Sequence, residues 1–227
     1  MTFGRLILSI ILTSLVFPGV ILGLGGSILW IEGWILSLWF IVMILSTVIY
    51  MFVKDPDLLS ERRKAPGSGN QKRWDVYILY AIFVISIIWI LIMPLDAKRF
   101  GWSPKFPLWL KIVGGFLLIL SIFFIFMTTV ENTYLSTRVR IQSERKQQLI
   151  TTGVYGFVRH PLYLGYILLI IGGPFLLGSI AGLVLGLLGI ITIVARIFGE
   201  EKMLVCELEG YEEYREKVKY RLIPFIW

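Results

Sequence analysis

Reactive side chains gather in two short segments of the chain, and the first contains its single histidine. His160 follows Arg159 and precedes Pro161 within the run from Gly153 to Gly165. Proline is tolerated in the first turn of a helix, because no backbone N–H is needed there. We therefore expect Arg159 and His160 at a helix N-terminus near the membrane surface, where free N–H groups and the helix dipole favour a carboxylate or a phosphate.

The second segment holds Arg196, Glu200 and Glu201 at the end of a long apolar run. Arg196 and Glu200 are four residues apart and share a helical face, so an exposed ion pair worth a few tenths of a kcal/mol is the simplest interpretation. Ionisable groups beside a membrane core are costly unless they face the bundle interior or a ligand. This position favours a functional site, and a guanidinium suits an anionic acceptor. Glu201 is expected to face water.

The composition excludes an ordinary soluble domain. Of the 227 residues, 57% are hydrophobic and 16% are charged, whereas soluble chains carry about 25% charged residues. The net charge of +7 is attributed to basic cytoplasmic loops rather than to nucleic-acid binding. The single cysteine, Cys206, excludes an internal disulfide and is interpreted as structural. The sequence predicts an all-α, polytopic integral membrane bundle.

Four apolar runs, each long enough to cross a hydrocarbon core of about 30 Å, precede the first reactive segment. They cover residues 6–29, 33–53, 76–95 and 108–130, and residues 54–75 form a basic loop with a Pro-Gly-Ser-Gly-Asn turn cluster. We assign residues 1–130 to four transmembrane helices and residues 131–227 to a catalytic region.

The next apolar run, from Pro161 to Ala195, has 35 residues and no charge. A single helix of that length would measure about 52 Å, which exceeds the hydrocarbon core. We therefore predict a tight helical hairpin with its break at Gly172-Gly173-Pro174, which gives about six apolar crossings. Residues 196–222 are expected to follow as an amphipathic helix, broken near Gly210, against the cytoplasmic end of the bundle.

Basic residues are distributed unevenly over the connecting segments. Six, five and six Lys or Arg residues fall in residues 54–75, 131–160 and 196–227, against three in the two loops on the opposite side. Because Lys and Arg accumulate on the cytoplasmic side, both termini are expected in the cytoplasm.

Four further residues receive ordinary interpretations from their positions. Arg138 and Arg140 are interpreted as topology determinants or lipid head-group contacts. Tyr211 and Tyr214 are interpreted equally well as interfacial aromatics or as cofactor contacts.

In these segments the sequence resembles the isoprenylcysteine carboxyl methyltransferases and their phospholipid-methylating relatives. Two groups of residues carry the resemblance over residues 138–227: the Gly-Val-Tyr, Arg-His-Pro, Tyr and Gly series from Gly153 to Gly165, and Arg196 with Glu200-Glu201, Tyr211, Tyr214 and Pro224. Earlier residues resemble only uncharacterised prokaryotic members, through Asp55-Pro56 and residues 96–104. The resemblance implies a membrane enzyme that uses S-adenosylmethionine.

The resemblance also implies residue roles. Residues of both segments and of the preceding loop would surround the cofactor: Gln142, Gln147, Gln148, Leu149, Ile150, Tyr155, His160, Pro161, Leu162, Tyr163 and Glu200. Arg196 would bind the substrate's carboxylate, and Arg196 and His160 would act in catalysis, with no metal. A carboxylate acceptor needs no general base at neutral pH, whereas a thiol or an amine would require His160 or Glu200 as proton acceptor.

The acceptor and the enzyme class stay open at this point. A lipophilic or prenylated acceptor is expected, but the acidic run Glu200-Glu201 is shorter than in eukaryotic enzymes that act on prenylated proteins, so a phospholipid or a thiol is an alternative. An NADPH-dependent reductase of the sterol-reductase type is similar at the His-Pro and Tyr positions, although such enzymes are longer. A membrane protein that kept the fold and lost the chemistry is the non-enzymatic alternative.

Overall fold

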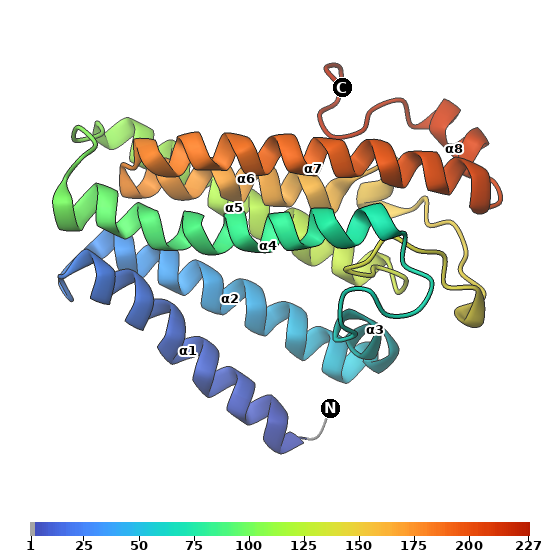
Figure 1. Cartoon of the computed structure of the whole chain (residues 1–227), viewed down its shortest axis with the longest axis horizontal. Coiled ribbons are helices and arrows are strands. Elements are labelled where there is room, and N and C mark those ends of the chain that lie inside the picture. The colour runs from blue at the N-terminus through green and yellow to red at the C-terminus, as the bar shows by residue number, and fades with distance from the viewer. Residues whose placement is uncertain (1–2) are drawn as a thin grey trace.

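A computed structural model describes residues 3–227, and no strand occurs among them (Figure 1). The helices are α1 (Phe3–Gly25), α2 (Ile31–Lys54), α3 (Pro56–Arg62), α4 (Arg73–Pro94), α5 (Leu108–Glu131), α6 (Pro161–Leu177), α7 (Ile180–Glu207) and α8 (Tyr211–Lys217). A π-helical turn, η1, covers Leu95–Phe100, and short 3-10 turns cover Ser143–Arg145 and Gly153–Gly156. The predicted all-α membrane bundle is confirmed.

Five of these helices, α1, α2, α4, α5 and α7, are long and apolar enough to cross a membrane, and α6 is a shorter apolar helix of 17 residues. The four predicted N-terminal spans coincide with α1, α2, α4 and α5 to within four residues. The basic loop contains α3, whose first turn is capped by Asp55: the Leu58 N–H donates to Asp55 Oδ1 at 2.9 Å. Proline follows this cap at the first helical position, where it is well tolerated.

The predicted hairpin exists as α6 and α7, but its predicted break was wrong. Helix α6 continues through Gly172-Gly173-Pro174 and ends at Gly178, which has φ +82°. The N–H groups of Gly178 and Ser179 both donate to the Pro174 carbonyl, at 2.8 and 3.0 Å. This left-handed C-cap terminates the helix.

The two glycines stay helical because they allow close packing. A Cβ at Gly172 would lie 2.9 Å from the Gly114 carbonyl oxygen of α5, and a Cβ at Gly173 would lie 2.9 Å from the Trp89 ring of α4. Real side chains do not make contacts that short, so glycine is needed here for the approach of α6 to its neighbours. The glycines therefore serve the packing of α6 and do not end it.

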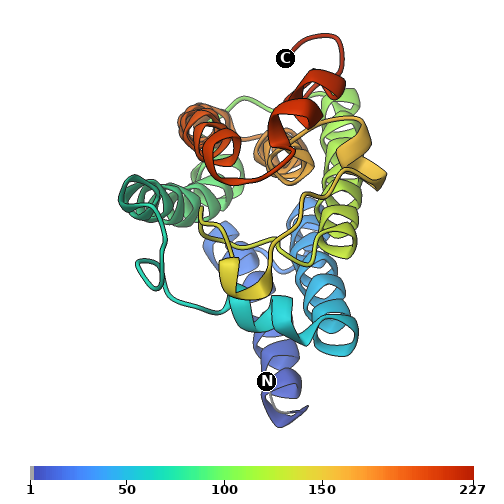
Figure 2. The ribbon, with the colours of Figure 1, turned by 90° about the vertical axis from the view of Figure 1, so that its right-hand side faces the viewer.

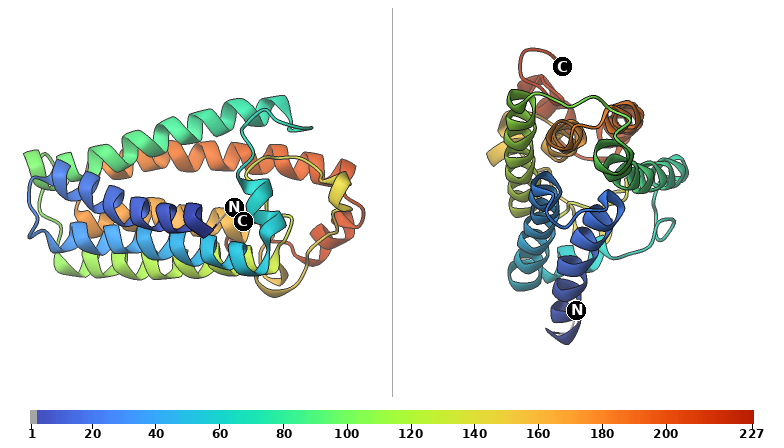
Figure 3. Two further views of the ribbon diagram at one scale, coloured as in Figure 1. Left: turned by 90° about the horizontal axis from the view of Figure 1, so that it is seen from below. Right: turned by 90° about the vertical axis from the view of Figure 1, so that its left-hand side faces the viewer.

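The helices are arranged with α4 and α7 on one side, α2 and α5 on the other, and α6 between α5 and α7 (Figure 2). The N-terminal part of α1 extends away from the other helices (Figure 3). Helix α3, helix α8 and the long loop between α5 and α6 gather at one end of the bundle (Figure 1). The reactive residues lie at this polar end.

The C-terminal region differs from the predicted amphipathic helix over residues 196–222. Helix α7 continues without a break to Glu207, α8 starts only after Gly210, and residues 218–227 are not helical. The predicted break near Gly210 is present, since α7 ends three residues earlier and Gly210, with φ +79°, is the N-cap of α8. The tail is instead fixed by backbone pairing, since the N–H groups of Arg159 and His160 donate to the carbonyls of Tyr220 and Arg221 at 3.0 and 2.9 Å.

Candidate active site

His160 occupies the N-cap of α6, with Pro161 at the first helical position. Its backbone is held by the C-terminal tail, and its ring Nε2 lies 3.3 Å from Glu201 Oε1. The imidazole is therefore fixed beside a carboxylate at the polar end of α6.

Glu201 does not face water, and that expectation was wrong. The residue is 5% exposed, and its carboxylate accepts from Arg159 Nε and Arg221 Nε, both at 2.7 Å. Arg159 comes from the segment before α6, and Arg221 comes from the C-terminal tail. The backbones of these two segments are hydrogen-bonded to each other, and both arginines contact the Glu201 carboxylate. Glu201 therefore joins three parts of the chain around His160.

Arg196 is not paired with Glu200, so the simple ion pair four residues apart is not formed. Its Nε donates to Asp75 Oδ1 at 2.7 Å, and its Nη2 donates to the Thr137 carbonyl at 2.6 Å. Glu200 accepts from the Tyr163 hydroxyl at 2.7 Å. The two residues of this helical face thus have different partners.

Asp75, at the start of α4, is fully buried. Besides Arg196, its carboxylate accepts from Gln71 Nε2 and from the Val139 N–H, each at 2.7 Å. Four donors, counting both guanidinium contacts, hold this carboxylate. It fixes the guanidinium of Arg196 in one orientation.

Arg138 and Arg140 are buried, which corrects their interpretation as lipid head-group contacts. Arg138 Nη2 and Arg140 Nε donate to Glu61 Oε1 at 2.6 and 2.9 Å. Burial by itself raises the pKa of Glu61, but hydrogen bonds from Arg140, Lys64, Ser136 and Arg138 outweigh it and hold the pKa well below its usual range. Glu61 is thus an ionised anchor for the loop between α5 and α6.

Tyr211 and Tyr214 are buried and not interfacial. The Tyr214 hydroxyl donates to the Tyr155 carbonyl at 2.7 Å, and Asn132 Nδ2 donates to the Tyr155 hydroxyl at 2.8 Å. Burial raises the pKa of all three phenols. All three phenols remain neutral at physiological pH, and the Tyr211 hydroxyl has no hydrogen-bond partner among the described residues.

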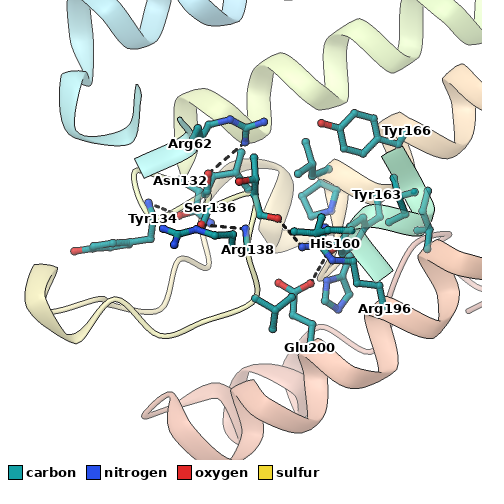
Figure 4. A pocket seen from close by; sticks show the side chains of 18 of the residues that line it. Arg62, Asn132, Tyr134, Ser136, Arg138, His160, Tyr163, Tyr166, Arg196 and Glu200 are labelled. Carbon is teal, nitrogen blue, oxygen red and sulfur yellow. Dashed lines mark hydrogen bonds between the residues drawn. The ribbon is translucent and has the colours of Figure 1, made fainter. Parts of the chain in front are cut away.

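One cavity of about 780 Å³ connects these groups (Figure 4). Every residue predicted for the site except one lines it: Gln147, Gln148, Leu149, Ile150, Tyr155, His160, Pro161, Leu162, Tyr163, Arg196 and Glu200. The cavity continues from the polar end between the apolar faces of α2, α4, α6 and α7, where its lining includes Phe40, Phe83, Ile90, Leu169 and Ile170.

Gln142 is the exception. It is fully buried outside the cavity lining, where its Nε2 donates to the Tyr134 carbonyl at 2.7 Å and its Oε1 accepts from Arg145 at 2.9 Å. Its observed contacts organise the loop. Among the described residues, no group of three or more His, Cys, Asp or Glu side chains could hold a metal ion.

Comparison with known proteins finds similarity in the region around this cavity. The family model for isoprenylcysteine carboxyl methyltransferase (ICMT) matches residues 112–206. The protein-S-isoprenylcysteine O-methyltransferase of Schizosaccharomyces pombe is 39% identical over 72 residues, a match that spans 31% of this chain and only 30% of that protein.

The fold of the ICMT-like chain extends beyond the matched region. The structure of a eukaryotic intramembrane Ras methyltransferase ICMT superposes with a TM-score of 0.57 at 22% identity, and the match covers 94% of this chain and 75% of that one. The two proteins therefore share a helical membrane fold that includes the N-terminal helices.

Three residues of the site were missed by sequence reasoning, and all three lie outside the ICMT-matched region. Glu61 and Asp75 are the buried partners of arginines, and Arg62 lines the cavity. Asp75 offered a signal, because it is the single acid directly before the apolar span of residues 76–95. Glu61 and Arg62 stand among other charges in a polar loop and offered none.

Proposed function

We propose that this chain is an S-adenosylmethionine-dependent methyltransferase that methylates the carboxylate of a lipophilic acceptor such as a prenylated cysteine. The observation that carries the proposal is the single cavity, which joins a polar end to an apolar space between helices. A ligand with a polar reacting group and a long apolar tail would use both parts, as most binding sites combine apolar walls with a few placed polar groups. The ICMT-matched region supplies most of the polar part.

The donor set at the polar end fits the cofactor. Glu200 is a carboxylate available to an ammonium or to ribose hydroxyls, and Leu149, Leu204 and Leu208 offer apolar contact to a base. The residues that would hold the cofactor are those predicted from the sequence that line the cavity: Gln147, Gln148, Leu149, Ile150, Tyr155, His160, Pro161, Leu162, Tyr163 and Glu200. When bound, S-adenosylmethionine supplies an electrophilic methyl group.

Arg196 would bind and orient the acceptor's carboxylate. Because Asp75 and the Thr137 carbonyl already fix its guanidinium, little reorganisation is needed when the acceptor binds. A carboxylate is a nucleophile without losing a proton, so the chain's task is to align it with the methyl group at about 3–3.5 Å. His160 would stabilise the polar end beside Glu201 and would be needed as a base only for a thiol or an amine.

The test is methyl transfer from radiolabelled S-adenosylmethionine to an N-acetylated prenylcysteine by the purified protein in detergent. A carboxyl methyl ester is hydrolysed in base and releases labelled methanol, whereas methyl groups on nitrogen or sulfur stay attached. We expect base-labile product from the wild type, strongly reduced product from Glu200→Gln, and unchanged product from the control Glu209→Gln, which alters an exposed carboxylate. Base-stable product would contradict a carboxylate acceptor.

Equilibrium binding separates the enzyme classes. Micromolar binding of S-adenosylhomocysteine that is weakened in Glu200→Gln would support the methyltransferase. Binding of NADPH without binding of S-adenosylhomocysteine would refute it in favour of a reductase. Equal turnover of a short-chain, water-soluble acceptor and a prenylated one would remove the role proposed for the apolar part of the cavity.

A further inference from the structure

The charges of the cavity lining are almost all neutralised by buried partners. Five arginines line the cavity, namely Arg62, Arg138, Arg140, Arg159 and Arg196. Four of them form ion pairs with carboxylates behind the lining: Arg138 and Arg140 with Glu61, Arg159 with Glu201, and Arg196 with Asp75. Of these five arginines, only Arg62 has no acidic partner within residues 3–227.

Arg62 stands at the end of α3 with most of its donors open. Its single side-chain hydrogen bond among the described residues runs from Nη1 to the Leu135 carbonyl at 3.3 Å. A guanidinium carries five N–H donors, and this side chain is only half buried. A cation at the wall of a cavity, anchored by one weak bond, is suited to an anionic ligand.

Glu200 is the matching exception among the acids. It is the one carboxylate in the cavity lining, it accepts from the Tyr163 hydroxyl, and it forms no ion pair within the described residues. The cavity thus holds one uncompensated cation and one uncompensated anion, which approach it from the α3 side and the α7 side (Figure 4).

The two charges have opposite effects on the same phenol, that of Tyr155. Burial raises the pKa of Tyr155, the negative charge of Glu200 raises it further, and the positive charge of Arg62 opposes the rise. Arg62, Glu200 and Tyr155 all line the same cavity, so the two charges face a common space.

We propose that Arg62 and Glu200 together bind the α-amino acid head of one ligand, with Arg62 binding its carboxylate and Glu200 its ammonium. The inference rests on the proposed function, because S-adenosylmethionine and S-adenosylhomocysteine carry such a head. The inference gives the two arginines different tasks. Arg62, which has no ion-pair partner, binds the cofactor, and Arg196, which is paired with Asp75, binds the acceptor. Arg62 also lies outside the ICMT-matched region.

The experiment compares two ligands that differ only in the carboxylate. Equilibrium binding of S-adenosylhomocysteine and of its decarboxylated analogue is measured for the wild type, for Arg62→Gln and for the control Arg63→Gln, which alters the neighbouring exposed arginine. A hydrogen-bonded charge pair corresponds to about a 10- to 100-fold change in affinity. We expect Arg62→Gln to lose about that factor for S-adenosylhomocysteine and nothing for the analogue, with Arg63→Gln unchanged.

Other results overturn the inference. Unchanged affinity of Arg62→Gln for S-adenosylhomocysteine, with a raised KM for the acceptor, would assign Arg62 to the acceptor. Equal loss for both ligands in a folded variant would exclude a carboxylate contact. If Arg62→Gln does not fold, Arg62→Lys is used, and we expect it to retain part of the wild type's preference for S-adenosylhomocysteine over the analogue. A wild type that binds neither ligand would refute the proposed function itself.

Discussion

Two buried aspartates, Asp75 in α4 and Asp96 in the η1 turn that follows it, contact α7 at opposite ends of the bundle, and they do so with different partners. At the polar end, Asp75 accepts from the charged guanidinium of Arg196. At the distal end, Asp96 accepts from neutral donors, the Ser103 and Ser179 hydroxyls at 2.7 and 2.6 Å and the Ala181 N–H at 3.0 Å. Both aspartates are at most 1% exposed.

The difference separates a charge that serves structure from a charge that serves a site. Asp96 stabilises the N-terminus of α7, where free N–H groups and the helix dipole favour an anion. Its three neutral donors are sufficient partners, and Asp96 forms no ion pair within the described residues. Asp75 pairs with an arginine that faces the cavity, and a buried ion pair contributes little net stability compared with an apolar pair. We therefore attribute the role of Asp75 to the orientation of the Arg196 guanidinium and not to stability.

The largest effect is expected from Asp75→Ala. The change leaves Arg196 buried without a counter-charge, which typically costs about 3–5 kcal/mol in the free energy of unfolding. It also frees the guanidinium, so methyl transfer by the remaining folded protein should fall strongly. Thermal unfolding in detergent and activity per folded protein measure the two effects.

A double variant tests the reason for that loss. Asp75→Asn with Arg196→Met removes both charges and should recover much of the stability, since the desolvated charge is no longer present. Activity should stay low because the acceptor's carboxylate has lost its partner. Recovery of activity in this variant would contradict the role proposed for Arg196.

A smaller and purely structural effect is expected from Asp96→Asn. The substitution keeps the shape but removes the charge that three donors share, with an expected cost of about 1–3 kcal/mol in unfolding free energy. Activity per folded protein should equal that of the wild type. If Asp96→Asn impaired turnover as Asp75→Ala does, the contrast between the two ends would be lost.

The pH dependence of stability should come from the polar end through Glu61. The pKa of Glu61 is below its unfolded value in the folded protein, so its contribution is present above about pH 4.5 and is lost as the pH falls toward the folded pKa. Each such group changes stability by at most about 1.4 kcal/mol per pH unit. The unfolding free energy of Glu61→Gln should therefore be lower than that of the wild type at pH 7 and should fall less steeply below about pH 5. Parallel pH profiles would contradict this assignment.

Much of the fold could be predicted from the sequence because it depends on local pattern. Apolar runs of about 20 residues define spans in a bilayer, and Pro161 placed His160 at the start of a helix. The break at Gly172-Gly173-Pro174 was mispredicted because glycine and proline end helices by local rules, whereas here α5 and Trp89 require glycine. That requirement appears only when the neighbours are known.

The buried carboxylates could not be predicted for the same reason. Arg196 and Asp75 are 121 residues apart, and Arg138 and Glu61 are 77 apart. A charged residue is expected to be exposed when the partner that the fold brings to it is not known. Glu201 was therefore expected to face water, and Arg138 was interpreted as a topology determinant or a lipid head-group contact.

The smallest effect is expected at the distal end, from the ion pair between Glu32 and Lys111. Both side chains are about a quarter exposed, at 26% and 27%, so water screens this pair more than it screens the buried pairs of the polar end. We expect it to contribute about 1 kcal/mol or less, close to the range of exposed pairs. Lys111→Met should therefore change the unfolding free energy by less than about 1 kcal/mol and leave activity intact. If thermal unfolding showed a loss as large as that of Asp75→Ala, charge pairing would stabilise both ends alike, and the polar end would no longer be distinguished by its buried ion pairs.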